Sequence, residues 1–260
     1  MTIPFRRRRT GVRPSPVFLA FVAVAAAAGW LLWSQTEPTR TNRLLVFVFV
    51  AACWVVSLSL HEFAHAFLAW RFGDDEVEAR GYLSLNPFKY AHPFLSILLP
   101  LVFILIGGIG LPGGAVYLHP HRFRSNLQRA LVSLSGPAVN LVLAVVTIEW
   151  VAHTGSLNAH PLFWLAVAGL GLLQVMAAIL NLLPIPGLDG WGAIEPYLDR
   201  SVQEGAQQVK PFGMLIVFAL LQVNTLNVKF FDFVNWVFGW SGLPSVYGQV
   251  GVQLMQFWRN

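Results

Sequence analysis

Two histidines four residues apart, His61 and His65, form the motif H-E-x-x-H with Glu62 between them. On an α-helix this spacing places both imidazoles on one face, where they can bind one Zn²⁺ ion with the glutamate beside it as general base. So short a motif also arises by chance. Here it lies in the apolar run from Leu44 to Trp70, where a polar group without a partner is costly. The motif therefore predicts a functional metal site with hydrolytic chemistry.

A catalytic zinc ion usually has three protein ligands and one open position for water. The candidates for the third ligand are the other histidines and the carboxylates at the membrane edge. Asp189 stands out because Pro184 and Pro186 unwind the chain just before it. The preceding apolar segment also carries Gln174 and Asn181, which are seven residues apart and share one helix face.

The composition predicts an all-α polytopic membrane protein. Of the 260 residues, 56% are hydrophobic and 11% are charged, which excludes an ordinary soluble domain. The single cysteine, Cys53, excludes a disulfide framework and a cysteine-rich metal site. The net charge of +5 comes mostly from basic clusters at membrane edges. It indicates contact with the lipid bilayer and no nucleic-acid partner.

The pattern of apolar runs predicts about five to six transmembrane helices. The apolar run from Val17 to Trp33 could belong to a signal peptide. It is longer than the usual ~7–15 apolar residues and ends in tryptophans, which favours a retained first span. The expected regions are a basic cytoplasmic N-terminus (1–16), the first span with its outer loop (17–43), a catalytic membrane core (44–200) and C-terminal transmembrane and amphipathic helices (201–260).

Two short segments have the pattern of β-strands, and the C-terminal region has two helical patterns. Residues 79–85 and 115–118 are expected to form a small β element near the zinc site. Residues 212–228 are just long enough to span the membrane, and residues 230–240 are aromatic and amphipathic, as in an interfacial helix.

The number of crossings predicts a re-entrant hairpin at residues 93–118. With the N-terminus inside, the span from Leu44 ends inside and places His61 nearer the cytoplasmic face. A full crossing at 93–111 would put Asp189 on the opposite side of the membrane from His61. It would also put the basic patch at 119–129 outside, against the positive-inside bias. The glycine-rich segment should therefore enter the membrane and return, packed in protein or facing water.

Three motifs together resemble one known family. His61-Glu62-Phe63-Ala64-His65, Leu188-Asp189-Gly190 and, between them, Ser135-Gly136-Pro137-Ala138-Val139-Asn140 are similar to the site-2 protease family of intramembrane zinc metalloproteases. Residues 81–87 and 113–120 resemble its compact bacterial branch, and the likeness covers roughly residues 44–200. The resemblance implies that His61, His65 and Asp189 bind zinc and that Glu62 is the base. Sequence for the PDZ or CBS domains of other branches is absent.

The implied activity is hydrolysis of peptide bonds near the cytoplasmic side, in membrane-embedded or membrane-anchored protein substrates. The family adds an expected role in regulated intramembrane proteolysis. Asn181 and Asn140 are the candidate donors to the developing oxyanion. Alternatively, each amide only hydrogen-bonds a neighbouring helix. An exposed strand could hold the substrate extended by β-augmentation.

Two other functions are compatible with these residues. One is a non-catalytic zinc-binding membrane scaffold or carrier, whose expected mark is the loss of Glu62 or of one ligand. The sequence has lost neither. The other is a zinc protease that cleaves soluble or membrane-surface peptides, which the same residues would serve.

Overall fold

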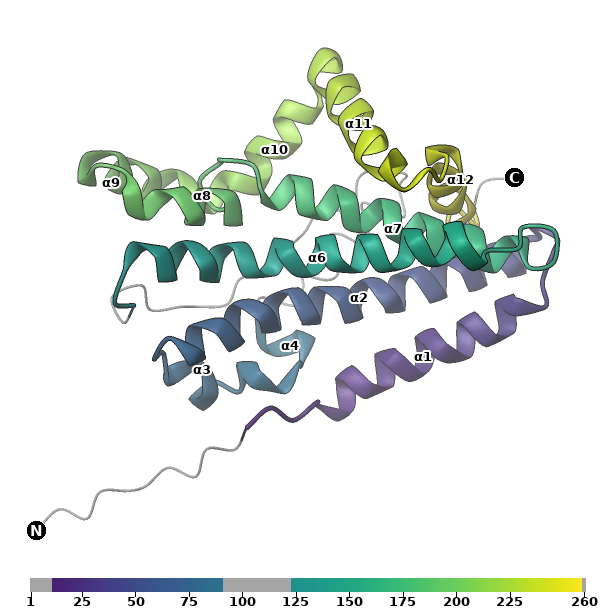
Figure 1. The fold of residues 1–260 in the computed structure, drawn as a ribbon, viewed down its shortest axis with the longest axis horizontal. Coiled ribbons are helices and arrows are strands. Elements are labelled where there is room, and N and C mark those ends of the chain that lie inside the picture. The colour runs from purple at the N-terminus through teal and green to yellow at the C-terminus, as the bar shows by residue number, and fades with distance from the viewer. Residues whose placement is uncertain (1–10, 91–122, 259–260) are drawn as a thin grey trace, which may run out of the picture.

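The computed structural model describes residues 11–90 and 123–258, and these are mostly helical (Figure 1). The helices are α1 (Pro16–Trp33), α2 (Arg40–Arg71), α3 (Glu76–Ala79), α4 (Pro87–Tyr90), α6 (Asn126–Thr154), α7 (Pro161–Asn181), α8 (Asp189–Ile194), α9 (Arg200–Val209), α10 (Gly213–Leu221), α11 (Asn224–Phe238) and α12 (Ser245–Leu254). Short 3₁₀ turns are η1 (Tyr82–Ser84), η4 (Glu195–Tyr197), η5 (Lys210–Phe212) and η6 (Gly239–Ser241). The all-α prediction is confirmed for this part of the chain.

Side-chain caps define where the long helices begin. Ser15 Oγ accepts a hydrogen bond from the Phe18 amide at the start of α1, and Ser125 Oγ accepts one from the Gln128 amide at the start of α6. Each bond satisfies a donor that the first helical turn leaves unpaired. Pro161 opens α7, where its missing N–H is not needed.

Four helices, α1, α2, α6 and α7, are long and apolar enough to cross a membrane. A fifth crossing is possible only if the helical segments 200–221 and 224–241, which meet at 97°, count as one broken span. Among the described residues the number is therefore four or five, against the expected five to six. The chain does not form one straight helix over 212–228. It breaks at 222–223, where Asn227 Nδ2 donates to the Leu221 carbonyl oxygen that the break exposes (3.0 Å).

The centre of the molecule is a three-helix core of α2, α6 and α7, with α1 packed on α2 and α12 packed on α7 (Figure 1). The contacts fix the directions of these helices. The rings of Phe49 and Phe163 lie 5.8 Å apart near the starts of α2 and α7. At the other end of α2, His65 meets Val132 near the start of α6. Helices α2 and α7 therefore run the same way, and α6 runs opposite to both.

This arrangement bears on the predicted re-entrant hairpin. Helix α2 ends and α6 begins at the same end of the bundle, so the chain between them makes no net crossing from one end to the other. The prediction of a re-entrant hairpin requires α2 to end and α6 to begin on the same side of the membrane, and this arrangement meets that condition. The hairpin at 93–118 and the second predicted strand, 115–118, lie outside the described residues.

The predicted strand at 79–85 is wrong. Gly81 and Leu85 both adopt left-handed backbone conformations, with φ of +73° and +56°. These two residues enclose a single 3₁₀ turn in which Ser84 Oγ donates to the Gly81 carbonyl oxygen (2.6 Å). Such backbone angles are incompatible with an extended strand.

Tertiary contacts hold this turn in place beneath the end of α2. The Tyr90 hydroxyl donates to the Tyr82 carbonyl oxygen at 2.9 Å. Both tyrosine rings and Leu83 belong to a small apolar cluster with Ala66 and Ala69 of α2. The segment expected to pair with substrate as a strand is instead a compact cap on α2, and the described residues contain no strand.

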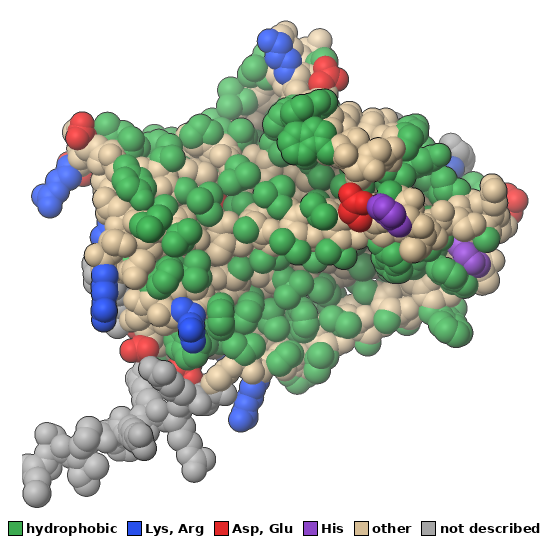
Figure 2. Space-filling model, viewed as in Figure 1, with side chains coloured by type: hydrophobic (Ala, Val, Ile, Leu, Met, Phe, Trp, Pro, Cys, Tyr) green, Lys and Arg blue, Asp and Glu red, His purple; other side chains and the backbone are tan. Residues whose placement is uncertain are grey.

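The surface fits a lipid environment. Hydrophobic side chains cover most of the middle of the face shown in Figure 2, while Lys and Arg side chains lie mainly toward the end that holds α3 and α9. Large apolar side chains of α1 and α6, such as Leu19, Val142 and Val145, are more than half exposed. With four apolar helices of spanning length, the chain is a multi-pass membrane protein.

Candidate metal centre

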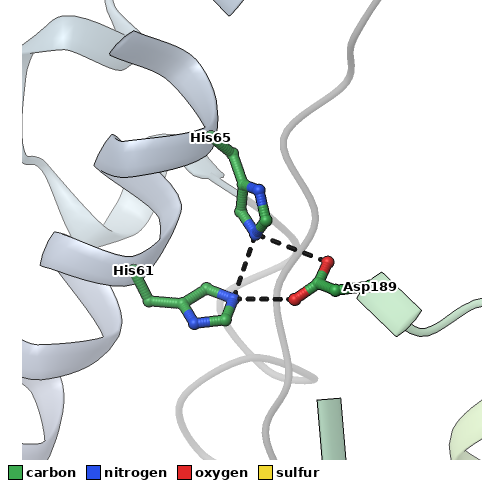
Figure 3. A group of neighbouring side chains, drawn as sticks. All are labelled: His61, His65 and Asp189. Atoms are coloured by element: carbon green, nitrogen blue, oxygen red, sulfur yellow. Dashed lines mark hydrogen bonds and ion pairs between the residues drawn. The ribbon is translucent and has the colours of Figure 1, made fainter. Parts of the chain in front are cut away.

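His61 and His65 lie one helical turn apart on α2 and point to the same side of it (Figure 3). Their Nε2 atoms are 3.1 Å apart, and both side chains are buried. At this distance the two ring nitrogens can share a proton or a cation. The spacing expected from the motif is therefore realised as a pair of converging nitrogen donors.

Asp189 completes the group from the opposite side of the site. Its Oδ2 lies 3.2 Å from His61 Nε2 and its Oδ1 lies 3.4 Å from His65 Nε2 (Figure 3). The ligand atoms of the three residues all lie within 4.8 Å of one another. The structure thus brings together the two histidines and the carboxylate that the sequence singled out.

The end of α7 delivers Asp189 to this position. The helix stops at Asn181, and the chain continues irregularly until Asp189 begins α8. Burial favours the neutral acid, but the His65 and His61 imidazoles lower the pKa of the Asp189 carboxyl below its ordinary value. The carboxyl is thereby held as the anion that a metal ligand must be.

The other nitrogen of each imidazole, Nδ1, has a hydrogen-bond partner on α6. His65 Nδ1 donates to the Val132 carbonyl oxygen at 2.7 Å, and Ser135 Oγ donates to the same oxygen. His61 Nδ1 lies 2.6 Å from Asn140 Oδ1. A backbone carbonyl can only accept, so Nδ1 of His65 carries a proton, and in the neutral imidazole Nε2 is then the nitrogen that can bind a metal. This is the arrangement usual for metal-binding histidines.

Gly136 leaves room for an ion between the donors. A Cβ atom on this residue would collide with Nε2 of both His65 and His61. The space in front of the two nitrogens is therefore kept open by the missing side chain on α6. Two imidazoles and one carboxylate form a donor set that zinc accepts, with a fourth position left for water. The residues present fit a zinc ion.

Glu62 lies beside this group in the same cavity. The side chain is 3% exposed and lines a space of about 80 Å³ together with His61, Asp189, Asn140 and Asn181. A space of this size holds several water molecules. The predicted base and both predicted amide donors are thus within the cavity wall. Asn140 also lies directly behind His61, so its position has two chemical uses.

Sequence reasoning did not assign a role in the centre to three contributors. The carbonyl oxygen of Val132, which orients His65, carries no signal in the sequence because every residue has one. The side chains of Gln174 and Ser57, which lie behind Asn140, are polar residues in apolar runs. These polar residues could be found in the sequence. The groups to which they hydrogen-bond could not, because that depends on how α2, α6 and α7 are rotated against one another.

The remaining described histidines do not join the site. His153 and His160 lie at the opposite end of the bundle, where His160 Nδ1 donates to the Trp33 carbonyl oxygen at 2.6 Å. His92, His119 and His121 lie outside the described residues.

Comparisons with known proteins agree on one family. The protein Rip2 of Mycolicibacterium smegmatis is 51% identical over 254 residues, which cover 97% of each chain. Rip2 of Mycobacterium tuberculosis H37Rv is 47% identical over 96% of each chain. YwhC of Bacillus subtilis is 32% identical over 201 residues, covering 74% of this chain and 86% of its own.

The names of all three relatives class them provisionally as zinc metalloproteases. No family model and no solved structure matches the chain. The zinc ligation implied by these names agrees with the donor group of His61, His65 and Asp189. With its H-E-x-x-H and L-D-G motifs joined in one buried centre, the chain belongs to the site-2 protease family of zinc metalloproteases.

Proposed function

We propose that this protein is an intramembrane zinc protease that hydrolyses peptide bonds of membrane-embedded or membrane-anchored proteins near the cytoplasmic side. The observation that carries the proposal is the convergence of three ligand atoms within 4.8 Å, with Glu62 in the same buried cavity, inside a bundle of membrane-spanning helices. The relatives' names support the protease activity. The substrate class and a role in regulated intramembrane proteolysis are part of the proposal.

Each group has a defined task in this chemistry. A zinc ion held by His61, His65 and Asp189 would supply a Lewis acid for the scissile carbonyl and would lower the pKa of a bound water molecule. Glu62 takes the proton from the attacking water and delivers it to the leaving amine. Asn181 lines the cavity next to Leu188 and Asp189, where its amide can donate to the developing oxyanion. His61, His65 and Asp189 hold the ion.

The depth of the centre supports a substrate within the membrane. His61 is ten residues before Arg71 at the end of α2, a distance of about 15 Å along the helix. With Arg71 at the edge of a hydrocarbon core about 30 Å thick, the centre would lie well inside that core. Water must reach the cavity from the nearer end of the bundle. That end carries Arg71, Arg80 and Arg129, which favours the cytoplasmic side.

The test is the substitution Glu62→Gln in the purified protein, reconstituted with a transmembrane peptide substrate. Glutamine keeps the size of the side chain but cannot accept the proton from water. Cleavage should fall by at least about 100-fold, the usual contribution of a general base, while bound zinc should remain. The measurements are product formation by mass spectrometry and zinc content by elemental analysis.

The matched control is Glu149→Gln, which neutralises a carboxylate of α6 at the far end of the bundle, where it pairs with His153. This variant should cleave like the parent. Removal of zinc by a chelator should stop cleavage, and added Zn²⁺ should restore it. A protein that binds zinc but cleaves nothing before or after the Glu62 change would be the scaffold or carrier, and the protease proposal would be abandoned.

A further inference from the structure

A line of three buried polar side chains runs from the metal centre across the helix core. His61 Nδ1 lies 2.6 Å from Asn140 Oδ1, and Asn140 Nδ2 donates to Gln174 Oε1 at 2.7 Å. Gln174 Nε2 then donates to Ser57 Oγ at 2.8 Å, and the Ser57 hydroxyl donates to the Trp54 carbonyl oxygen at 2.8 Å. The line joins α6, α7 and α2 in turn.

We propose that Asn140 and Gln174 are positioning residues that fix the proton of His61 on Nδ1 and so keep its Nε2 available to the metal. This inference rests on the zinc centre of the proposed function and deepens it. We name the line Asn140, Gln174 and Ser57 the amide relay.

The direction of the relay is set by which atoms can donate. If Nε2 of His61 binds a metal, Nδ1 must carry the proton, and Asn140 must present its oxygen. The Asn140 nitrogen then faces Gln174, which must also present its oxygen. The nitrogen of Gln174 then faces Ser57, whose hydroxyl passes its own proton to a backbone carbonyl. Each donor therefore has one acceptor, and reversing one amide alone would place two donors face to face.

A comparison of the two ligands shows why His61 needs a relay. His65 Nδ1 reaches a backbone carbonyl directly, that of Val132, and a carbonyl can never donate. Asn140 offers His61 an amide that could turn over and present its nitrogen instead. Gln174 and Ser57 oppose that reversal, because it would take the Ser57 proton away from the carbonyl oxygen of Trp54. Both imidazoles are thus oriented by a backbone carbonyl, one directly and one through three side chains.

Burial makes the orientation costly to lose. Gln174 is 1% exposed, Asn140 is 4% exposed and Ser57 is 5% exposed. In this core a broken link leaves a buried amide without its side-chain partner. Helix packing alone does not require these three polar side chains. Apolar side chains would fill the same space without the need to keep every hydrogen bond paired.

The experiment measures zinc affinity by competition with a chromophoric chelator, without substrate. Asn140→Leu and Gln174→Leu keep similar volumes and remove the relay from two different helices. Loss of a partner that orients a metal ligand costs about 10- to 100-fold in metal affinity, and we expect this loss in both variants. Because no cleavage is measured, the result is independent of whether the protein proves to be a protease.

Asn140→Asp is the rescue variant. One carboxylate oxygen can accept from His61 Nδ1, and the other can accept from Gln174 Nε2 after that amide turns over. The Ser57 hydroxyl can then donate to Gln174 Oε1 in place of the Trp54 carbonyl oxygen, so each link between side chains keeps one donor and one acceptor. Zinc affinity should stay within a few-fold of the parent. A role for Asn140 only as a donor to the substrate predicts the opposite pattern, in which zinc affinity is unchanged in Asn140→Leu and cleavage is lost in Asn140→Asp.

Ser57→Ala and Ser59→Ala form a matched pair on α2. Both hydroxyls are buried and donate to a carbonyl of their own helix at 2.8 Å, but Ser57 alone of the two accepts from Gln174. Ser57→Ala should weaken zinc binding and Ser59→Ala should not. This pair tests the role of the amide relay even if Asn140→Leu and Gln174→Leu are not recovered as monodisperse protein. Equal zinc affinity in the pair, or an unchanged affinity in a folded leucine variant, overturns the proposal.

Discussion

At the scale of single residues, the metal centre depends on the absence of a side chain at Gly136. The Gly136 backbone lies so close to His61 and His65 that a Cβ atom would touch both Nε2 atoms. A methyl group there would stand against the two nitrogens that would hold the metal. The same close approach lets α6 place Val132 and Asn140 behind the two imidazoles.

We predict that Gly136→Ala weakens zinc binding. Overpacking a close contact costs about 1–3 kcal/mol. If this cost falls on the metal-bound state, zinc affinity falls by roughly 10- to 100-fold. The measurement is competition with a chelator. The control is Gly205→Ala, in a helical position where a Cβ meets nothing within 4 Å, and it should bind zinc like the parent. Equal affinities of the two variants would show that the ion does not occupy the space beside Gly136.

The residues that meet in the candidate metal centre were largely predictable from the sequence, and their hydrogen-bond partners on the neighbouring helices were not. His61, Glu62 and His65 follow from one local motif, and Asp189 follows from the prolines that precede it. The link between Asn140 and His61 depends on the rotation of α6 against α2. A pattern along one helix does not contain that rotation, because it is set by packing between helices.

At the scale of elements, the long helices were predictable and the short cap was not. Apolar length and capping residues such as Ser15 and Ser125 mark the spans and their starts. At residues 79–85 the spacing of apolar side chains favoured a strand. The left-handed conformation at Gly81 and the hydrogen bond from Tyr90 to Tyr82 outweigh that local pattern. Short segments are decided by tertiary contacts, which carry more free energy than the local preference.

The crossing of α12 over α7 gives a prediction at this scale. The two helices approach closely at Gly251, where a Cβ atom would collide with the Leu165 carbonyl oxygen and with the backbone of Gly169. Gly251→Ala should separate the helices at a cost of about 1–3 kcal/mol. We expect a lower midpoint of thermal unfolding in detergent, by roughly 2–4 °C per kcal/mol.

Zinc affinity should be unchanged in Gly251→Ala, because α12 supplies no residue to the metal centre. Gly239→Ala is the control, since a Cβ there meets nothing within 4 Å. If Gly251→Ala unfolds at the temperature of Gly239→Ala, the close crossing contributes nothing to stability.

At the scale of the whole molecule, the fold must bring one end of α2, the start of α6 and the end of α7 to the same depth. Helices α2 and α7 run in parallel and α6 runs against them, so His65, Val132 and Asp189 meet near one end of the bundle. Counting crossings in the sequence predicted this meeting. The same prediction assumed that the basic residues at the metal-centre end of the bundle lie in the cytoplasm.

Site-directed labelling tests the orientation of the bundle. In a Cys53→Ala background, which removes the single native thiol, one new cysteine replaces exposed Arg124 near the metal-centre end. Another replaces exposed Ser156 at the opposite end. In intact cells a membrane-impermeant maleimide should label the Ser156→Cys protein and leave the Arg124→Cys protein unlabelled. Both should react once the membrane is permeabilised, which shows that each thiol is accessible. Labelling of Arg124→Cys in intact cells would place the centre at the outer side, and the substrate bond would then have to be cut from there.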